Sequence, residues 1–306
     1  MPEIIAVGEL LLDLISLKYA DNFRAADKYQ RLPGGSPANL ATNLARLGHN
    51  VGLVATVGQD DAGALLLEAA TDAGVDVTHV ARHAEPTTLI LVTKSKAVSD
   101  FEPYRMADRH ITAAQLPDDY LSGARVLHTT AFALSKDPAR TTILEAMSRA
   151  AARGIRLSVD FNYADKIWNG DRAAGLQSLK DIAALGALVK VSEVDYERLF
   201  EEMVIDYHSA AHKVKDLGAH AVCLTLGEEG CFVVHDDGEF YLPARAVEVR
   251  DTTGAGDAFW SGFLAAFLAG EDWERCAKSG RAVAERKLTT VGPLTKDMNI
   301  EDLLAE

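Results

Sequence analysis

The sequence predicts an α/β protein in which a doubly wound, mostly parallel sheet carries helices on both faces. Short apolar runs of strand length alternate with longer amphipathic runs of helix length along almost the whole chain. Strands covered on both faces are continuously apolar, and the helices between them provide the crossovers that parallel pairing needs. No repeat, low-complexity tract or linker divides the 306 residues, so we expect a single domain over residues 1–306.

The expected elements follow one another in regular order. Near the start, the apolar runs 4–8 and 51–58 indicate strands, and the patterns 38–48 and 62–74 indicate helices that end at glycines. Because the carboxyl ends of parallel strands meet at one edge of a sheet, the loops at that edge form the expected ligand site. The later elements are a strand and loop over 125–134, a helix over 138–154, and strands over 155–162, 187–192 and 221–227.

Two segments interrupt this alternation. Residues 11–33 and 86–106 contain alternating and charged residues, and neither has a helix of its own to cover it. We expect both to form a small β-sheet that stands off the main domain and contacts its ligand edge as a lid. On these residues alone, a decorated hairpin without a functional role is an equal alternative.

Composition excludes several classes of partner. The formal net charge is -14 and the pI is about 5.1, whereas a nucleic-acid or anionic-membrane surface needs concentrated Lys and Arg. The cysteines Cys223, Cys231 and Cys276 form no CxxC pair, so a reduced, cytoplasmic setting is expected. The N-terminus lacks the features of a signal peptide, and no apolar stretch reaches transmembrane length.

The stretch "DTTGAGDAFWSGFLAAFL" over 251–268 is the most unusual local pattern. An Asp or Thr at a helix start normally needs only a capping explanation. Here Gly254 and Gly256 both fall inside the first turn of an apolar helix, where glycine is unfavourable. Glycines leave the backbone N–H groups accessible, which suits a site that an anion must approach.

The other glycine-rich stretches are less specific when each is taken alone. "GGSPAN" over 34–39 is compatible with a tight turn, "VGQDDAG" over 57–63 with a turn whose Asp60 or Asp61 caps a helix, and "TLGEEGC" over 225–231 with a strand, turn and strand. The chain has no GxxxxGKS or GxxxxGKT sequence, and "GAGDAF" lacks the third glycine of a dinucleotide fingerprint.

In combination, these motifs resemble the ribokinase-like, or PfkB, family of carbohydrate kinases over essentially the full length. The resemblance is carried by "PGGSPANLATNLARLG" and "DTTGAGDAFWSGF", with "TVGQDDAG", "DFN" and "TLGEEG" between them in the family's order. Within the family, "VGELLLDLIS" and the first signature look most like the fructokinase and 2-keto-3-deoxygluconate kinase branch.

The resemblance implies a catalytic centre at the start of the last apolar helix. Backbone N–H groups of Gly254, Ala255 and Gly256 would form an anion hole for the transferring phosphoryl group. Asp257 would accept the proton of the attacking sugar hydroxyl. The residue-level alternative for Asp257 is a carboxylate stabilised by the helix dipole.

The resemblance also implies binding residues on either side of this centre. On the sugar side they are Asp13, Gly34, Gly35, Asn39 and the lid residue Arg105. For Asp13 the alternative is a strand-end charge that faces water, and for Arg105 it is a solvated arginine of the lid. On the nucleotide side they are Thr225, Gly227 and Gly230, with Lys190 and Ser192 at the end of the preceding strand. In many relatives a potassium ion lies beside the anion hole, at the positions of Asp251 and Thr253.

Three positions depart from the family pattern. The usual Asn-x-x-Glu near the metal is Ser192-Glu193-Val194-Asp195 here, so Mg²⁺ would be held through water by Asp195. Ala164 stands where an arginine is usual, which weakens the case for a sugar-acid substrate. Arg281 stands where many relatives have an adenine-side asparagine.

The sequence therefore predicts an ATP-dependent sugar kinase acting on a primary hydroxyl of a ketose, with fructose as the first expectation. A 2-keto-3-deoxygluconate kinase, a nucleoside kinase, and a non-catalytic sugar- or nucleotide-sensing protein on the same fold remain alternatives. ATP, Mg²⁺ and a small sugar are the expected ligands, and a homodimer formed through the lid is the expected assembly.

Overall fold

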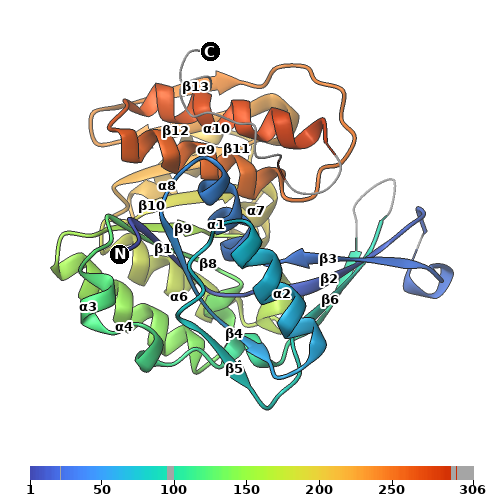
Figure 1. Cartoon of the computed structure of the whole chain (residues 1–306). Helices are drawn as coiled ribbons and strands as arrows, with labels where there is room; N and C mark the ends of the chain where they lie inside the picture. Colours follow the sequence, from blue (N-terminus) through green and yellow to red (C-terminus); the bar gives the residue numbers. More distant parts are fainter. Residues whose placement is uncertain (21, 95–99, 291–293, 295–306) are drawn as a thin grey trace.

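The main body is a nine-stranded sheet in the order β13-β12-β11-β10-β9-β8-β1-β4-β5. The computed structural model describes residues 1–20, 22–94, 100–290 and 294 (Figure 1). Pairing is parallel from β5 through β11, and β12 and β13 join the sheet antiparallel. The predicted mostly parallel sheet is confirmed. The strands are β1 (Ile4–Val7), β4 (Val51–Gly58), β5 (Val80–His83), β8 (Val126–Thr130), β9 (Arg156–Asp160), β10 (Leu188–Ser192), β11 (Ala221–Thr225), β12 (Gly230–His235) and β13 (Gly238–Pro243).

Helices cover both faces of this sheet, and each face has its own apolar core. The face that carries the glycine-rich motifs is covered by α1 (Ser36–Arg46), α2 (Asp61–Asp72), α9 (Ala255–Ala269) and α10 (Trp273–Leu288). The opposite face is covered by α3 (Asp118–Leu121), α4 (Ala139–Ala152), α5 (Asp165–Trp168), α6 (Arg172–Ala183), α7 (Glu193–Phe200) and α8 (Tyr207–Lys215). This arrangement is the doubly wound fold that the sequence predicts.

A second, four-stranded sheet in the order β3-β2-β6-β7 projects to one side of the main body (Figure 1). Its strands β2 (Leu11–Ser16) and β3 (Tyr29–Gly34) pair antiparallel, and β6 (Leu89–Thr93) pairs with β2 in parallel and with β7 (Asp100–Tyr104) antiparallel. The prediction of a small sheet from 11–33 and 86–106 is confirmed. Its roles as a lid and as a dimer contact stay predictions.

The helix starts show how local sequence places the site. Helix α1 begins at Ser36, two residues before its expected start, because Gly35 takes a φ of 101° and turns the chain from β3 into the helix. At α2 the Asp60 carboxylate accepts a hydrogen bond from the Gly63 N–H at 2.8 Å, so the expected cap is confirmed. Helix α9 begins after Gly254, whose φ of 74° lies in the left-handed region that favours glycine.

Among the described residues, no helix combines the length and the apolar character that a membrane crossing requires.

Candidate active site

The Asp257 carboxylate lies where the N-termini of α1 and α9 meet. Ser36 Oγ donates a hydrogen bond to Asp257 Oδ1 at 2.5 Å, and Asn39 Nδ2 donates to Oδ2 at 2.8 Å. Both donors belong to the first turns of α1, and Asp257 belongs to the first turn of α9. The two glycine-rich motifs, more than 200 residues apart, are therefore joined through one carboxylate.

The surroundings of this carboxylate shift its pKa toward neutral pH. Burial raises the pKa of Asp257 to about 6, and the nearby Asp160 charge adds to the rise. The hydrogen bonds from Ser36 and Asn39 and the charge of Lys190 act in the opposite direction. A carboxylate with this pKa can accept a proton near pH 7 more effectively than an ordinary aspartate.

The first turn of α9 presents backbone N–H groups next to Asp257. Among the described residues, the N–H groups of Gly256 and Asp257 have no hydrogen-bond acceptor. The Ala255 N–H, expected in the anion hole, instead donates to the Thr252 carbonyl at 3.2 Å. The N–H of Asp257 itself was not among the expected donors. Free N–H groups at a helix N-terminus are suited to bind phosphate oxygens.

A buried ion pair lies beside this turn. Lys190 is 4% exposed, and its Nζ is 2.8 Å from both carboxylate oxygens of Asp160. Burial lowers the pKa of Lys190, but the charge and hydrogen bonds of Asp160, together with the charges of Asp195 and Asp257, outweigh it and the pKa is raised. A Cβ at Gly256 would be 3.4 Å from Lys190 Nζ, so the ammonium lies close to the glycine turn. The ammonium thus places a fixed positive charge where phosphate groups would bind.

Asp160 was missed as a site residue in the sequence. It ends β9 next to Lys190 in the parallel register, and both positions lie at the carboxyl edge of the sheet. That placement is the signal that could have identified it.

The sugar-side residues also converge. Burial and the Asp257 charge raise the pKa of Asp13 to about 7. A Cβ at Gly34 would lie 2.1 Å from Asp13 Oδ2, so only glycine fits there. Asp13, Gly34 and Asn39 line one cavity together with Gly254. Four of the expected residues are therefore brought together, and their contact with a sugar stays a prediction.

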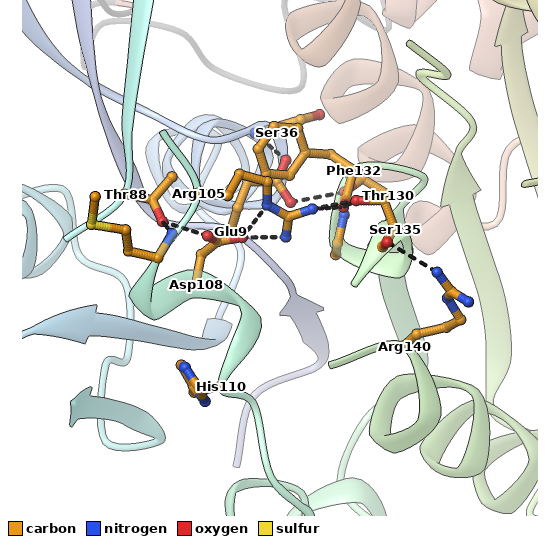
Figure 2. Close-up of polar contacts among 12 residues, drawn as sticks. Glu9, Ser36, Thr88, Arg105, Asp108, His110, Thr130, Phe132, Ser135 and Arg140 are labelled. Atoms are coloured by element: carbon orange, nitrogen blue, oxygen red, sulfur yellow. Dashed lines mark hydrogen bonds and ion pairs between the residues drawn. The ribbon is translucent and has the colours of Figure 1, made fainter. Parts of the chain in front are cut away.

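Glu9 accepts a hydrogen bond from the first residue of α1, and it was not identified as a site residue from the sequence. Its Oε1 accepts a hydrogen bond from the Ser36 N–H at 3.1 Å, and its Oε2 accepts one from Thr130 Oγ1 at 2.9 Å (Figure 2). Burial raises the pKa of Glu9 to about 8. Because Ser36 in turn donates to Asp257, Glu9 helps to fix the donor that orients the candidate base.

Arg105 has a more enclosed position than expected for a lid arginine. It follows β7, and its guanidinium bonds Asp108, the Phe132 carbonyl at 2.9 Å and the Ser135 hydroxyl (Figure 2). Its side chain is only 7% exposed and its carbon Cζ lies 4.3 Å from the centre of the Phe132 ring. Arg105 therefore ties the small sheet to the main body, and its contact with a sugar stays a prediction.

The expected nucleotide-side residues lie at the neighbouring strand ends. Ser192 ends β10 beside Thr225 of β11 in the parallel register. Ser192 caps α7, and its hydroxyl donates to Asp195 Oδ2 at 2.6 Å. Gly227 and Gly230 both have positive φ, of 56° and 115°, and form the turn that follows β11. These positions form one edge next to Lys190, and their contact with a nucleotide stays a prediction.

Asp195 is the carboxylate of this edge. Burial raises the pKa of Asp195 to about 6, whereas the Ser192 hydrogen bond and the Lys190 charge lower it. Carboxylate oxygens are the ligands that Mg²⁺ prefers, usually with water completing its coordination. The donor type therefore fits the expected magnesium site, which stays a prediction.

Comparison with known proteins gives the family. Residues 1–299 match the pfkB family carbohydrate kinase. An ATP-dependent 6-phosphofructokinase of Thermoanaerobacterium thermosaccharolyticum is 34% identical over 301 residues, which cover 98% of this chain and 92% of that protein. Fructokinase-1 of Zea mays is 32% identical over 271 residues, which cover 85% and 81% of the two chains.

A solved structure agrees with this result. The crystal structure of aminoimidazole riboside kinase from Salmonella enterica, complexed with aminoimidazole riboside and an ATP analog, has a TM-score of 0.82 at 26% identity. The match covers 99% of this chain and 98% of that chain. The chain belongs to the pfkB family of carbohydrate kinases, and the fold is ribokinase-like.

Asp257→Asn should remove most of the turnover while the protein stays folded. The amide keeps the shape of the side chain but cannot accept a proton, and the loss of a general base lowers the rate about a hundredfold or more. Steady-state ADP release with circular dichroism as a folding check measures this. Asp237→Asn, at an exposed turn, is the matched control. Near-parental turnover in the Asp257 variant would contradict the assignment.

The pH profile should report the raised pKa of Asp257. Because the base must be ionised to accept a proton, kcat/KM should fall as the pH is lowered through about 6. Initial rates measured from about pH 4.5 to about pH 9 at constant ionic strength give the profile. Rates that stay level down to the acid end of this range, as the ordinary aspartate pKa of 3.8 predicts, would show that Asp257 is not the titrating group.

Proposed function

We propose that the protein transfers the γ-phosphate of ATP to a primary hydroxyl of a ketose, with fructose as the preferred acceptor. The observation that carries this proposal is the buried Asp257 carboxylate in the same helical turn as the free N–H groups of Gly256 and Asp257. A proton acceptor and anion-binding donors in one turn are what an in-line phosphoryl transfer to an alcohol needs.

Each residue has a distinct task in the transfer. Asp257 accepts the hydroxyl proton as the oxygen attacks the γ-phosphorus, while Ser36 and Asn39 hold its carboxylate in place. The N–H groups of the α9 turn and the Lys190 ammonium stabilise the negative charge of the phosphoryl group. Mg²⁺ held through water by Asp195 would neutralise phosphate charge. The small sheet would exclude water from the acceptor side.

A neutral ketose fits these residues better than a sugar acid. A buried carboxylate needs a matching cation, and the expected lid arginine, Arg105, is already paired with Asp108. Ala164, where relatives offer an arginine, is the N-cap of α5 and provides no charge. These two features favour fructose over 2-keto-3-deoxygluconate.

A phosphorylated fructose is the second candidate acceptor. The 34% identical relative is named as a 6-phosphofructokinase, and Lys136 offers a cation near Arg105. Among the described residues, the side chain of Lys136 forms no hydrogen bond or ion pair, and Lys136 directly follows Ser135, which Arg105 contacts. Burial and the charges of Arg105, Arg140 and Arg109 lower the pKa of Lys136. An unpaired ammonium there would bind the phosphate group of the sugar.

A substrate panel with coupled ADP detection tests the proposal. With saturating ATP, fructose should give a higher kcat/KM than either fructose 6-phosphate or 2-keto-3-deoxygluconate. A preference for fructose 6-phosphate, with a KM that rises in Lys136→Gln, would establish the second candidate. A preference for 2-keto-3-deoxygluconate would contradict both, and ADP release that is independent of every sugar would contradict the kinase assignment of this site.

We also propose that a potassium ion supports the loop before α9. The Asp251 carboxylate accepts a hydrogen bond from the Thr253 N–H at 3.0 Å and lies 3.8 Å from Lys287 Nζ. Activity should therefore be higher in potassium chloride than in sodium chloride or a bulky organic chloride at equal ionic strength. Equal activity in all three salts would mean that Lys287 supplies the positive charge without a bound ion.

A further inference from the structure

A cavity of about 170 Å³ adjoins Asp257 and extends beyond the residues that the transfer uses. Asp13, Asn39 and Gly254 line it where it meets the catalytic centre, and Arg46 lines it as well. Its other walls include apolar side chains of α2 and of the small sheet. The proposed transfer assigns no role to Arg46.

Helix α1 supplies the polar wall of this cavity. Asn39, Asn43 and Arg46 are spaced by four and three residues, so they follow one face of the helix. Seven residues of helix rise correspond to about 10 Å between Asn39 and Arg46 along the axis. Arg46 therefore lies two turns away from the base, inside the same cavity.

The guanidinium of Arg46 lacks a partner. Its Nε and Nη1 atoms are buried without a hydrogen bond, and no carboxylate of the described residues forms an ion pair with it. Arg109 and Arg281 also have a buried Nε without a hydrogen bond, but each of them forms an ion pair with a glutamate. Burial lowers the pKa of Arg46. Arg46 is thus a cation whose donors point at no acceptor.

The carboxylates Asp13 and Asp251 line the cavity together with the cations Arg46 and Lys287. The Asp251 carboxylate is 3.8 Å from Lys287 Nζ and bonded to the Thr253 N–H. Asp251 and Lys287 therefore offset each other within the cavity, and no carboxylate of the described residues pairs with Arg46. A partly buried charge whose Nε and Nη1 donors have no acceptor is unfavourable, and the planar, multidentate guanidinium matches phosphate geometry.

We propose that this cavity is a phosphate-binding site in which the Arg46 guanidinium is the principal ligand and Lys287 a second cation. The phosphate could be a free anion that binds beside the catalytic centre, or the phosphate group of a phosphorylated sugar whose hydroxyl reaches Asp257. In the second case Arg46, and not Lys136, holds the phosphate of the sugar. Only the second source rests on the proposed kinase function. Both sources share one chemistry, and the experiment separates them.

The first arm measures binding without any sugar or turnover. Inorganic phosphate is titrated into the full-length protein, with sodium chloride at matched ionic strength as the reference, and the melting temperature is followed. The parent should be stabilised saturably, and Arg46→Gln should lose about tenfold or more in phosphate affinity, as expected for charge-assisted hydrogen bonds. Arg46→Lys keeps the charge but not the planar guanidinium with its several donors, so the phosphate affinity of this variant should be intermediate.

Arg149→Gln is the matched control. Arg149 lies on α4, on the opposite face of the sheet, and pairs with Asp118 at the surface. This variant should bind phosphate as the parent does. The proposal is overturned if phosphate does not stabilise the parent beyond chloride, or if the parent and both Arg46 variants bind it equally.

The second arm identifies the source by kinetics. If the phosphate belongs to the sugar, inorganic phosphate should compete with fructose 6-phosphate. Arg46→Gln should then raise the KM for fructose 6-phosphate about tenfold more than it raises the KM for fructose. If the anion is free, phosphate should change turnover without competing with either sugar. Absence of sugar kinase activity would contradict the proposed function, while the binding arm would still decide the phosphate site.

Discussion

The hydrogen bonds from Ser36 and Asn39 to the Asp257 carboxylate are the constraint on which the site depends. They join the first turn of α1 to the first turn of α9 and place both helix N-termini at one point. Gly35 and Gly254 are needed because the chain turns into both helices with positive φ, and Gly34 is needed because the Asp13 carboxylate packs against it. The Cβ contacts at Gly34 and the positive φ of Gly35 and Gly254 show this. The fold thereby delivers a base and anion donors from distant parts of the chain.

Electrostatics then sets the chemistry of this junction. Several carboxyl groups are buried within a small volume, and burial raises the pKa of Glu9, Asp13 and Asp257. At Asp257, the Lys190 charge and the hydrogen bonds from α1 offset part of that effect. The outcome is a carboxylate with a pKa of about 6, next to the positive end of a helix. Binding of an anionic phosphoryl group would complete the charge balance of the site.

Much of this arrangement could be predicted from the sequence, because periodicity and glycine placement act locally. The parallel sheet, the small second sheet, the Asp60 cap and the glycine turn before Asp257 all follow from short patterns. The contributions of Glu9 and Arg46 could not be predicted, because each depends on which side chains meet after folding. The strand-end position of Asp160 was a signal for its place in the site, but not for its pairing with Lys190. Arg105 illustrates the limit: its position was recognised, whereas its pairing with Asp108 and Ser135 required the geometry. The engagement of the Ala255 N–H by Thr252 is likewise a property of the folded loop.

The protonation of Asp257 is the central claim, and difference infrared spectroscopy measures it most directly. The carboxyl and carboxylate bands of the parent minus those of Asp257→Asn, recorded across pH in the absence of substrates, isolate this one group. The account predicts a carboxyl band that titrates with a pKa of about 6 and is missing from the variant. A difference spectrum that titrates at the ordinary aspartate value, or that shows no change across this range, would contradict it.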